Sequence, residues 1–409
     1  MTEQAFYIIF FKKKFKNIDY RSSIYYIRFM KKDNRFINEV FRIINGALRL
    51  DIEKVKNYTA FLADKLEESG DKDSAAYLRK MLKDSDNQLH PTGISFVKTV
   101  PVDSETRFPL LEKIDISNDQ ESPVILSQEQ WDTVNEFTSI AKSYSQMDAQ
   151  GLANSLTLLM YGPPGTGKTR LGRHIARELG LDLYIARLDG LISSYLGSTS
   201  KNIRSLFDFA SKNPCVLFLD EFDAIAKLRG DSQELGELKR VVNSFIQNLD
   251  SLGTQSIVIA ATNHPELLDS AIWRRFSYRI ELNLPSQSLR QGMWENSLPP
   301  LKFTEKEIEM LVDLSEGFSG ADIQEVCVRL RRKQIVHKTL PSFQDAFIAL
   351  KNISMQGASN QNNFLSKIQN KDEETIVKAL RERNPKLYSH TAIAELFGFS
   401  KSTAFRLSK

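Results

Sequence analysis

Cysteine is almost missing from this sequence: only Cys215 and Cys327 occur among 409 residues. Neither belongs to a CxxC pair or lies beside a histidine cluster, which excludes a disulfide framework and a cysteine-based zinc site. Long apolar runs are missing too, since the run at residues 5–11 is far shorter than the ~20 residues that a membrane-spanning helix needs. We therefore expect a cytoplasmic protein that does not enter a membrane.

An excess of charge of one sign is also missing. The chain has 55 Lys and Arg against 51 Asp and Glu, and its formal net charge of +4 is too small to indicate nucleic-acid binding by itself. Hydrophobic residues at 41% and charged residues at 26% are typical of a soluble globular protein. The length predicts about two to four domains of ~100 to 200 residues each.

The chain begins with three segments of different character. Residues 1–33 are an aromatic, lysine-rich extension, either a membrane-surface segment or a stretch before a start at Met30 that contributes little to the fold. Residues 34–88 have apolar residues three and four apart, which predicts a small helical module for partner binding or oligomerisation. Residues 89–122 are polar and rich in turn residues, so we expect a linker with one or two short strands.

Apolar runs then alternate with amphipathic segments over residues 123–298. The five runs are LTLLMY, LDLYIARL, CVLFLDE, SIVIAATN and YRIELNLP. This alternation predicts a three-layer α/β domain with a parallel five-stranded sheet. Three shorter segments follow: residues 299–350 are predicted to be helical, residues 351–372 form a polar linker, and residues 373–409 form a small all-α unit.

The stretch YGPPGTGKT, residues 161–169, connects an apolar run to an amphipathic helix. Its glycines let the backbone surround a phosphate chain, and the helix N-terminus presents a positive dipole to that chain. This Walker A, or P-loop, pattern predicts an ATP site in which Lys168 reaches the β- and γ-phosphates and Thr169 ligates Mg²⁺. The residues expected to bind ATP are Gly162, Pro163, Pro164, Gly165, Thr166, Gly167, Lys168, Thr169 and Arg170.

Two acids end the third apolar run, in CVLFLDEFD. They are predicted at the sheet edge where ligands of α/β proteins bind. Asp220 is expected to hold Mg²⁺ through its water shell, and Glu221 to polarise the attacking water. This is the Walker B pattern, and the two motifs together predict a Mg-ATP hydrolase.

The order of these motifs resembles that of the AAA ATPases, specifically the group that includes spastin and katanin, over about residues 123–350. The resemblance implies a ring of identical subunits, most often a hexamer. It places Asn263 of AATN beside the γ-phosphate, and it makes Arg274 and Arg275 arginine fingers in a neighbouring subunit's site. It also implies that GFSGADI, residues 317–323, begins a helix of a lid domain.

The segment after the second apolar run resembles the family's pore loop. Tyr195, Leu196 and Gly197 are then expected to contact an extended polypeptide in the ring's channel, because an aromatic ring packs on many kinds of side chain. A buried tyrosine in a turn is the alternative for Tyr195. This pattern favours a protein remodeller or unfoldase that delivers substrates to a protease or another effector.

The last twenty residues, HTAIAELFGFSKSTAFRLSK, have the spacing of a helix-turn-helix with Gly398 in the turn. Residues 375–409 hold seven Lys or Arg against two Glu, so this unit is locally basic. The residues expected to contact double-stranded DNA are Ser400, Lys401, Ser402 and Arg406. Docking of the tail on protein or on the next subunit is the alternative. A second function therefore stays open: a DNA-associated, ATP-dependent switch of a defence or mobile-element type.

Overall fold

The computed structural model describes most of the chain between Phe36 and Ser408. The described residues are 36–48, 51–87, 100–103, 107–116, 123–144, 147, 150, 156–188, 196–224, 235–252, 256–356, 363–368 and 371–408. They belong to two compact units: residues 1–97 with 142–153 and 212–214, and the remainder of the chain. The extension predicted at residues 1–33 lies outside the described residues.

The first unit is built from helices α3 (Ile37–Leu48), α4 (Ile52–Glu68) and α5 (Lys72–Asn87). Their apolar faces meet in a core that includes Val40, Tyr58 and Leu62, and burial of each such side chain contributes about 1.5–3 kcal/mol. Helix α4 begins where the Asp51 carboxylate accepts a hydrogen bond from the backbone N–H of Lys54.

The break between α4 and α5 differs in one detail from the sequence pattern. Gly70 has a φ of +91° and follows the end of α4, as the pattern indicates. The sequence SGDKDSAA, residues 69–76, predicts a break between two helices with Asp73 or Ser74 as the cap of the second, and this cap prediction was wrong. The cap is Asp71, whose carboxylate accepts a hydrogen bond from the backbone N–H of Ser74.

The second unit contains a six-stranded sheet in the order β1-β3-β4-β5-β2-β6. The strands are β1 (Glu112–Ile114), β2 (Leu156–Tyr161), β3 (Asp182–Arg187), β4 (Cys215–Asp220), β5 (Ile257–Thr262) and β6 (Tyr278–Glu281). Strands β2 to β6 are parallel and coincide with the five apolar runs. β1 lies in the predicted linker, where one or two short strands were expected, but its place in the sheet, antiparallel to β3, was not predicted. Its sequence, EKI, is charged and largely exposed, so it has no apolar run to reveal it.

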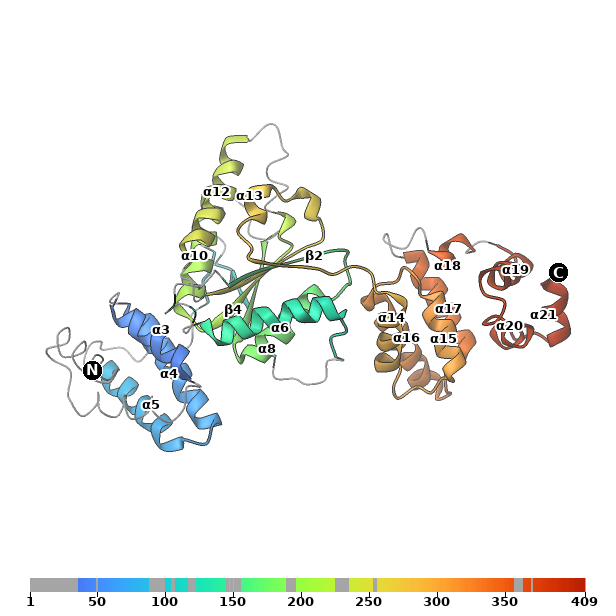
Figure 1. Cartoon of the computed structure of the whole chain (residues 1–409), viewed down its shortest axis with the longest axis horizontal. Helices are drawn as coiled ribbons and strands as arrows, with labels where there is room; N and C mark the ends of the chain where they lie inside the picture. Colours follow the sequence, from blue (N-terminus) through green and yellow to red (C-terminus); the bar gives the residue numbers. More distant parts are fainter. Residues whose placement is uncertain are drawn as a thin grey trace. The chain divides into compact units, whose positions relative to one another are not determined.

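Helices cover both faces of this sheet (Figure 1). Helices α6 (Gln128–Lys142) and α8 (Lys168–Leu179) lie on one face, and α10 (Leu196–Lys212) and α12 (Leu235–Ser251) on the other. Helix α8 approaches the sheet closely, because a Cβ atom at Gly172 would lie 2.5 Å from the ring of Phe218. On the opposite face, the rings of Phe207 and Phe245 pack edge to face with centroids 5.2 Å apart. Two short helices, η2 (Pro265–Leu267) and α13 (Ser270–Trp273), connect β5 to β6.

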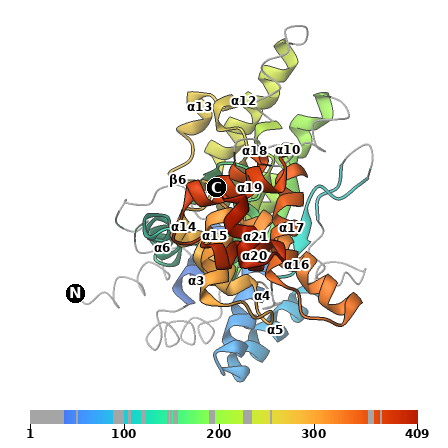
Figure 2. The same cartoon turned by 90° about the vertical axis from the view of Figure 1, so that its right-hand side faces the viewer.

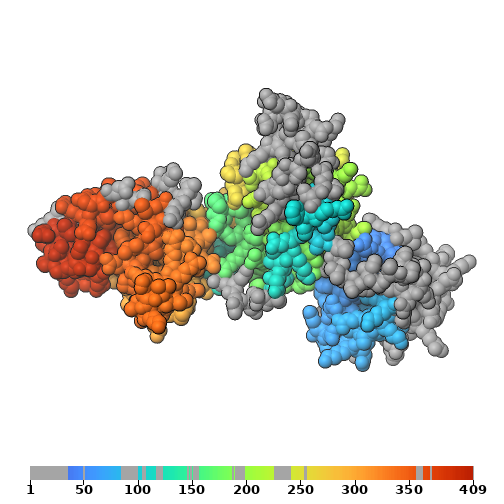
Figure 3. Space-filling view, turned by 180° about the vertical axis from the view of Figure 1, so that it is seen from behind, coloured from blue at the N-terminus to red at the C-terminus, as the bar shows by residue number. Residues whose placement is uncertain are grey.

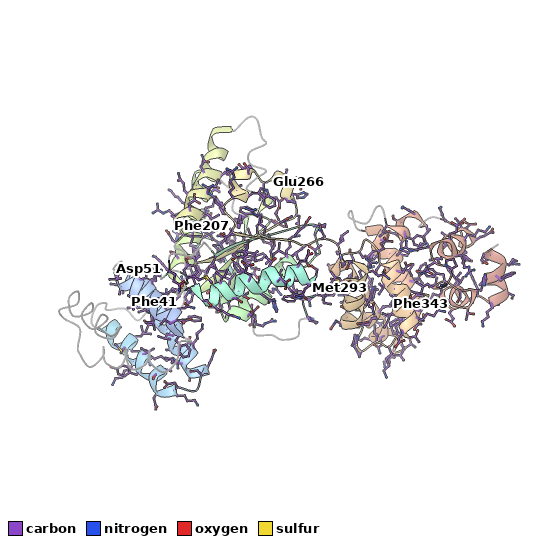
Figure 4. All side chains as sticks on the ribbon, in the orientation of Figure 1. Phe41, Asp51, Phe207, Glu266, Met293 and Phe343 are labelled. Carbon is purple, nitrogen blue, oxygen red and sulfur yellow. The ribbon has the colours of Figure 1, made fainter. Side chains whose placement is uncertain are left out.

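A helical lid follows β6. It contains α14 (Gln287–Ser297), α15 (Glu305–Leu314), α16 (Gly320–His337) and α17 (Phe343–Gln356). Thr304 and Ser319 begin α15 and α16 with reciprocal capping boxes, which fix where both helices start. Figure 4 shows Phe343 among the lid helices, and the buried core here includes Trp294, Leu311 and Phe347.

The C-terminal helices share this core with the lid. They are α18 (Phe364–Lys367), α19 (Glu373–Arg383), α20 (His390–Phe397) and α21 (Lys401–Leu407). One continuous apolar cluster runs from Trp294 in α14 to Ala404 in α21. The rings of Phe347 in α17 and Phe397 in α20 lie edge to face at 5.7 Å. Figures 2 and 3 show the red C-terminal helices next to the orange lid helices.

The polar linker predicted at residues 351–372 therefore differs from what the structure shows. Helix α17 continues to Gln356, and α18 places Leu365, which is fully buried, in the shared core together with Ile368. Apolar residues are few in this segment, which is rich in Asn, Gln and Ser, so the local composition concealed both. In the described part of the chain, no helix is long and apolar enough to span a bilayer.

Candidate nucleotide site

The glycine-rich loop between β2 and α8 has the backbone that its sequence requires. Gly162, Gly165 and Gly167 all have positive φ, at +139°, +77° and +96°. A Cβ atom at Gly162 would lie 2.2 Å from the carbonyl oxygen of Leu282. The loop thus runs close to the segment that follows β6, and its last glycine is the N-cap of α8.

The ammonium group of Lys168 lies over this loop. Its Nζ donates hydrogen bonds to the carbonyl oxygens of Gly162 at 2.7 Å and Pro163 at 2.8 Å. The side chain is buried, and this burial lowers the pKa of Lys168 to about 8, against the opposing effect of Asp220 and Asp223. A positive charge held in an apolar surrounding is strongly attracted to anionic phosphate oxygens.

Two oxygen ligands of the kind that Mg²⁺ prefers lie together at the ends of β4 and α8. The Thr169 hydroxyl is 3.4 Å from a carboxylate oxygen of Asp220, and both are only partly exposed. No group of three or more His, Cys, Asp or Glu among the described residues is placed to hold a metal ion. The hydroxyl of Thr169 and the carboxylate of Asp220 are oxygen donors that fit a Mg²⁺ ion, which usually binds through one or two protein ligands together with phosphates and water.

Glu221, directly after β4, has an unusual backbone. Its φ is +53°, a conformation that costs a non-glycine residue about 1–2 kcal/mol. Its side chain is exposed, and its backbone N–H donates a hydrogen bond to the Asp220 carboxylate at 3.0 Å, which helps to hold this conformation. Strain of this kind at a strand end is typical of a functional position.

Asn263 follows β5, which lies between β4 and β2, so it reaches the same sheet edge as Glu221 and the loop. Its neighbour Thr262 donates a hydrogen bond from Oγ1 to Asp223 at 3.2 Å. Asp223 is 5% exposed, and the sequence analysis gave it no role. The sequence signal that could have revealed it is the third acid of DEFD, residues 220–223. Asp223 accepts a hydrogen bond from the end of β5, the strand that Asn263 follows.

A cavity of about 190 Å³ adjoins the loop. Its walls are more apolar than polar, with Ser127, Gln130, Thr166, Asn283 and Ser286 as polar residues. Met293 contributes from the lid helix α14 (Figure 4). The lining residues are Ile125, Leu126, Ser127, Gln130, Thr166, Leu282, Asn283, Leu284, Pro285, Ser286, Leu289, Met293 and Gly320. Sequence reasoning missed this cavity, because its walls come from four separate segments, and the two that supply most of the lining carry no motif.

The lid contacts the loop directly. The backbone N–H of Ala321 donates to the carbonyl of Gly165 at 3.1 Å. A Cβ atom at Gly165 would lie 2.5 Å from the hydroxyl oxygen of Ser319. The GFSGADI segment thus lies against the loop.

The arginine pair lies at the end of α13. Arg274 is its C-cap and is exposed. Arg275 directs its guanidinium to Asp250, with Nε at 3.0 Å and Nη2 at 3.1 Å from the carboxylate oxygens. Arg275 is thus engaged within its own chain.

The predicted pore-loop residue Tyr195 lies outside the described residues. Leu196 and Gly197 are the first two residues of α10, and the structure describes only their backbone.

In the tail, Ser400 caps α21 by accepting a hydrogen bond from the N–H of Thr403 at 3.1 Å. Lys401, Ser402 and Arg406 are exposed, as is the Phe405 side chain at 49%. Ala404 is fully buried.

Comparison with known proteins places this site in context. Residues 158–284 match the model of the ATPase family associated with various cellular activities (AAA). An uncharacterized AAA family ATPase, y4kL of Sinorhizobium fredii, is 34% identical over 286 residues, which are 68% of this chain and 83% of that protein.

Other relatives match a smaller part. A putative 26S proteasome regulatory subunit homolog of Methanocaldococcus jannaschii is 38% identical over 48% of this chain and 54% of its own length. Human fidgetin-like protein 1 is 36% identical over 42% of this chain and 26% of its own length. The chain thus spans about half or less of these two relatives. The crystal structure of the FIGL-1 AAA domain in complex with ADP has the same fold, with a TM-score of 0.51 and 24% identity over 64% of this chain and 92% of that one.

Proposed function

Because the chain belongs to the AAA family of ATPases and hydrolyses ATP, we propose that it works as a Mg-ATP-driven ring that remodels or unfolds protein substrates. The observation that carries this proposal is the contact of the glycine loop with the lid, through Ala321 and Gly165, beside Lys168. Such a loop and lid can enclose a nucleotide and respond to its hydrolysis. The name of the Methanocaldococcus jannaschii relative, which refers to a regulatory subunit of the 26S proteasome, supports substrate delivery to a protease.

We assign the triphosphate to the loop from Gly162 to Arg170. Lys168 then exchanges its two carbonyl partners for phosphate oxygens. Bound Mg²⁺ would neutralise developing charge on the phosphates, held by Thr169 and Asp220. The purine base belongs in the cavity beside the loop, between its apolar walls.

Hydrolysis needs a group that orients water on the γ-phosphate. We assign this role to Glu221, whose carboxylate can accept a proton from water, with Asn263 hydrogen-bonded to the same water or to the γ-phosphate. Support comes from the shared sheet edge at which both residues follow adjacent strands. The positive φ of Glu221 and the exposure of its side chain also support this assignment.

A homo-oligomeric ring, with six subunits as the expected number, supplies the remaining charge. Arg274 is exposed at the end of α13 and is proposed to reach a neighbouring subunit's phosphates, where such an arginine is worth ~10³ to 10⁵ in rate. Arg275 supports it by fixing α13 to Asp250 on α12. Tyr195, Leu196 and Gly197 are proposed to contact substrate in the channel.

A second function has support from the tail. Helix α21 exposes Lys401 and Arg406 together with the hydroxyl of Ser402, a combination suited to phosphates and base edges of double-stranded DNA. Ser400 is proposed as a further contact, although its hydroxyl also caps the helix. In this case the ATPase is a DNA-associated switch for an effector, and both functions belong in the cytoplasm, where Cys215 and Cys327 stay as thiols.

Stimulation of ATP hydrolysis distinguishes the two functions. The full chain is assayed alone, with a permanently unfolded polypeptide, and with duplex DNA. Acceleration by the polypeptide and none by DNA supports remodelling, whereas acceleration by DNA alone supports the switch. The matched control is Lys401→Gln with Arg406→Gln, which should remove any effect of DNA and leave the effect of the polypeptide unchanged.

A further inference from the structure

One turn of the lid connects the nucleotide cavity to the C-terminal helices. This turn, residues 312–316, ends α15. On the cavity side, the buried Arg290 of α14 donates from Nε to the carbonyl of Val312 at 3.0 Å and from Nη1 to the carbonyl of Pro285 at 2.9 Å. Pro285 lines the cavity. One guanidinium therefore bridges the turn and the cavity wall.

A second connection on the same side comes from Trp294. Its Nε1 donates to the hydroxyl of Ser315 at 3.0 Å, and that hydroxyl donates to the carbonyl of Val312 at 3.2 Å. Trp294 and Ser315 are both fully buried, so neither bond competes with bulk water. Met293, next to Trp294 in the chain, lines the cavity.

The tail contacts this turn from the other side. The hydroxyl of Tyr388 donates to the Asp313 carboxylate at 2.6 Å. Arg383 donates from Nε to the same oxygen at 2.8 Å, and from Nη2 to the Asp313 carbonyl at 3.2 Å and to the Glu316 carboxylate. Hydrogen bonds to charged groups are among the stronger ones in proteins.

The protonation of Tyr388 and Arg383 favours a stable contact between the tail and the turn of residues 312–316. Tyr388 is fully buried, and burial together with the hydrogen bond to Asp313 raises its pKa. Burial favours the neutral form of Arg383, but its bonds to Asp313 and Glu316 outweigh this and raise its pKa. Both donors thus stay protonated at any physiological pH.

The packing around this contact leaves little room for the tail to move independently of the lid. Helices α19 to α21 share one apolar core with α14 to α17, and a close-packed core transmits displacement instead of absorbing it. A shift of the tail must therefore move the turn of residues 312–316, and with it the α14 wall of the cavity.

We propose that Tyr388, acting through Asp313, is a positioning residue for ATP. The tail holds the end of α15, and that turn sets the place of Arg290 and Trp294 behind the purine cavity. Since coupling between sites is reciprocal, nucleotide binding also restrains α19 to α21, the helices that carry the exposed Lys401 and Arg406. This inference rests on the purine site proposed above.

The test uses the full chain with Tyr388→Phe, which keeps the ring in the core and removes only the donor. We expect the KM for ATP to rise about fivefold, the lower end of usual coupling between sites, with kcat nearly unchanged. The matched control is Lys378→Gln, which removes an ion pair with Glu374 that stays within α19. Hydrogen exchange should also quicken in α14 of Tyr388→Phe, and added ATP should slow exchange in α19 to α21 of the unaltered chain.

A second variant, Arg383→Gln, keeps the test valid if Tyr388→Phe folds poorly. Arg383 lies at the margin of the core, with 22% of its side chain exposed, so its substitution disturbs the core less. If both variants loosen α19 to α21 in hydrogen exchange but keep the KM for ATP of the unaltered chain, the tail is only structural and the proposal is wrong. Failure of the proposed purine site looks different: substitution of Met293 by a charged residue would then leave ATP binding unaltered.

Discussion

The ammonium nitrogen of Lys168 lies 2.7 Å from the carbonyl oxygen of Gly162, six residues earlier in the chain. The lysine thus holds its own loop in a curved form through bonds that a phosphate chain can replace. Because the side chain is buried, its charge is sensitive to pH in a range that binding experiments can reach.

The first prediction concerns that sensitivity. Burial lowers the pKa of Lys168 to about 8, whereas bound phosphate favours the charged form and raises the pKa. Below about pH 8 the amine is charged with or without nucleotide, so this group adds no pH dependence. Above it, binding must take up a proton, and the affinity should fall by up to about tenfold per pH unit. Titration of a fluorescent ATP analogue between pH 7 and 10 measures this. Lys168→Met should bind weakly with no such slope, and a constant Kd in the unaltered chain would contradict the assignment.

The second prediction concerns Gly165. In Gly165→Ala the new methyl would lie 2.5 Å from the Ser319 hydroxyl, at a φ of +77° that alanine rarely adopts. The lid must then move from the loop, and we expect nucleotide affinity to fall at least about tenfold, or 1.4 kcal/mol. The matched control is Gly180→Ala, with a φ of +62° and no crowding from described atoms. It should cost about 1 kcal/mol of unfolding free energy and leave the Kd unchanged. Equal Kd values for the two variants would refute the lid contact.

The third prediction separates two roles of Glu221. Glu221→Gln should keep ATP binding and slow hydrolysis by about 10² to 10⁴, the usual contribution of a general base. Glu221→Gly should also lose hydrolysis but gain about 1 kcal/mol of unfolding free energy, because glycine adopts the φ of +53° without strain. Enzyme assays and thermal melts measure both effects. Glu129→Gln, an exposed acid on α6, serves as the control and should change neither. A Glu221→Gln variant with full activity would eliminate this residue as the base.

The fourth prediction concerns the ring. Arg274→Ala alone should lower kcat by about 10³ or more. When it is mixed with Glu221→Gln, each intact site of an Arg274→Ala subunit can receive Arg274 from a Glu221→Gln neighbour, so part of the activity should return. Two inactive variants that stay inactive in every mixing ratio, while still assembling together, would argue against an arginine acting between subunits.

The local sequence predicted the parts of the fold that depend on neighbouring residues, namely the apolar strands and the glycine loop. The five apolar runs became parallel strands because a doubly covered strand must be apolar on both faces. The curved backbone of the glycine loop was also predicted correctly, because glycine is the residue that most readily adopts a positive φ. A short strand was expected in the linker, but the place of β1 at the sheet edge was not, because edge pairing with β3 needs only backbone groups and the sequence of β1 has no apolar signal.

Long-range contacts were beyond this reasoning. Tyr388 and Asp313 are separated by 75 positions, and nothing near either residue indicates the other. The same holds for the proposed purine cavity, where Ile125, Thr166, Leu282 and Gly320 come together from four segments. The tail was predicted as a separate unit for this reason, whereas its apolar face belongs to the lid core.

We propose that ATP hydrolysis drives work on polypeptides through Tyr195. Its most direct test is the loss of fluorescence from a folded fluorescent protein with an unstructured extension, followed in the presence of the full chain and ATP. We expect unfolding by the unaltered chain, and none by Tyr195→Ala even though that variant still hydrolyses ATP. Unfolding at the same rate by both, or no unfolding of any extended substrate by an active ATPase, would contradict it.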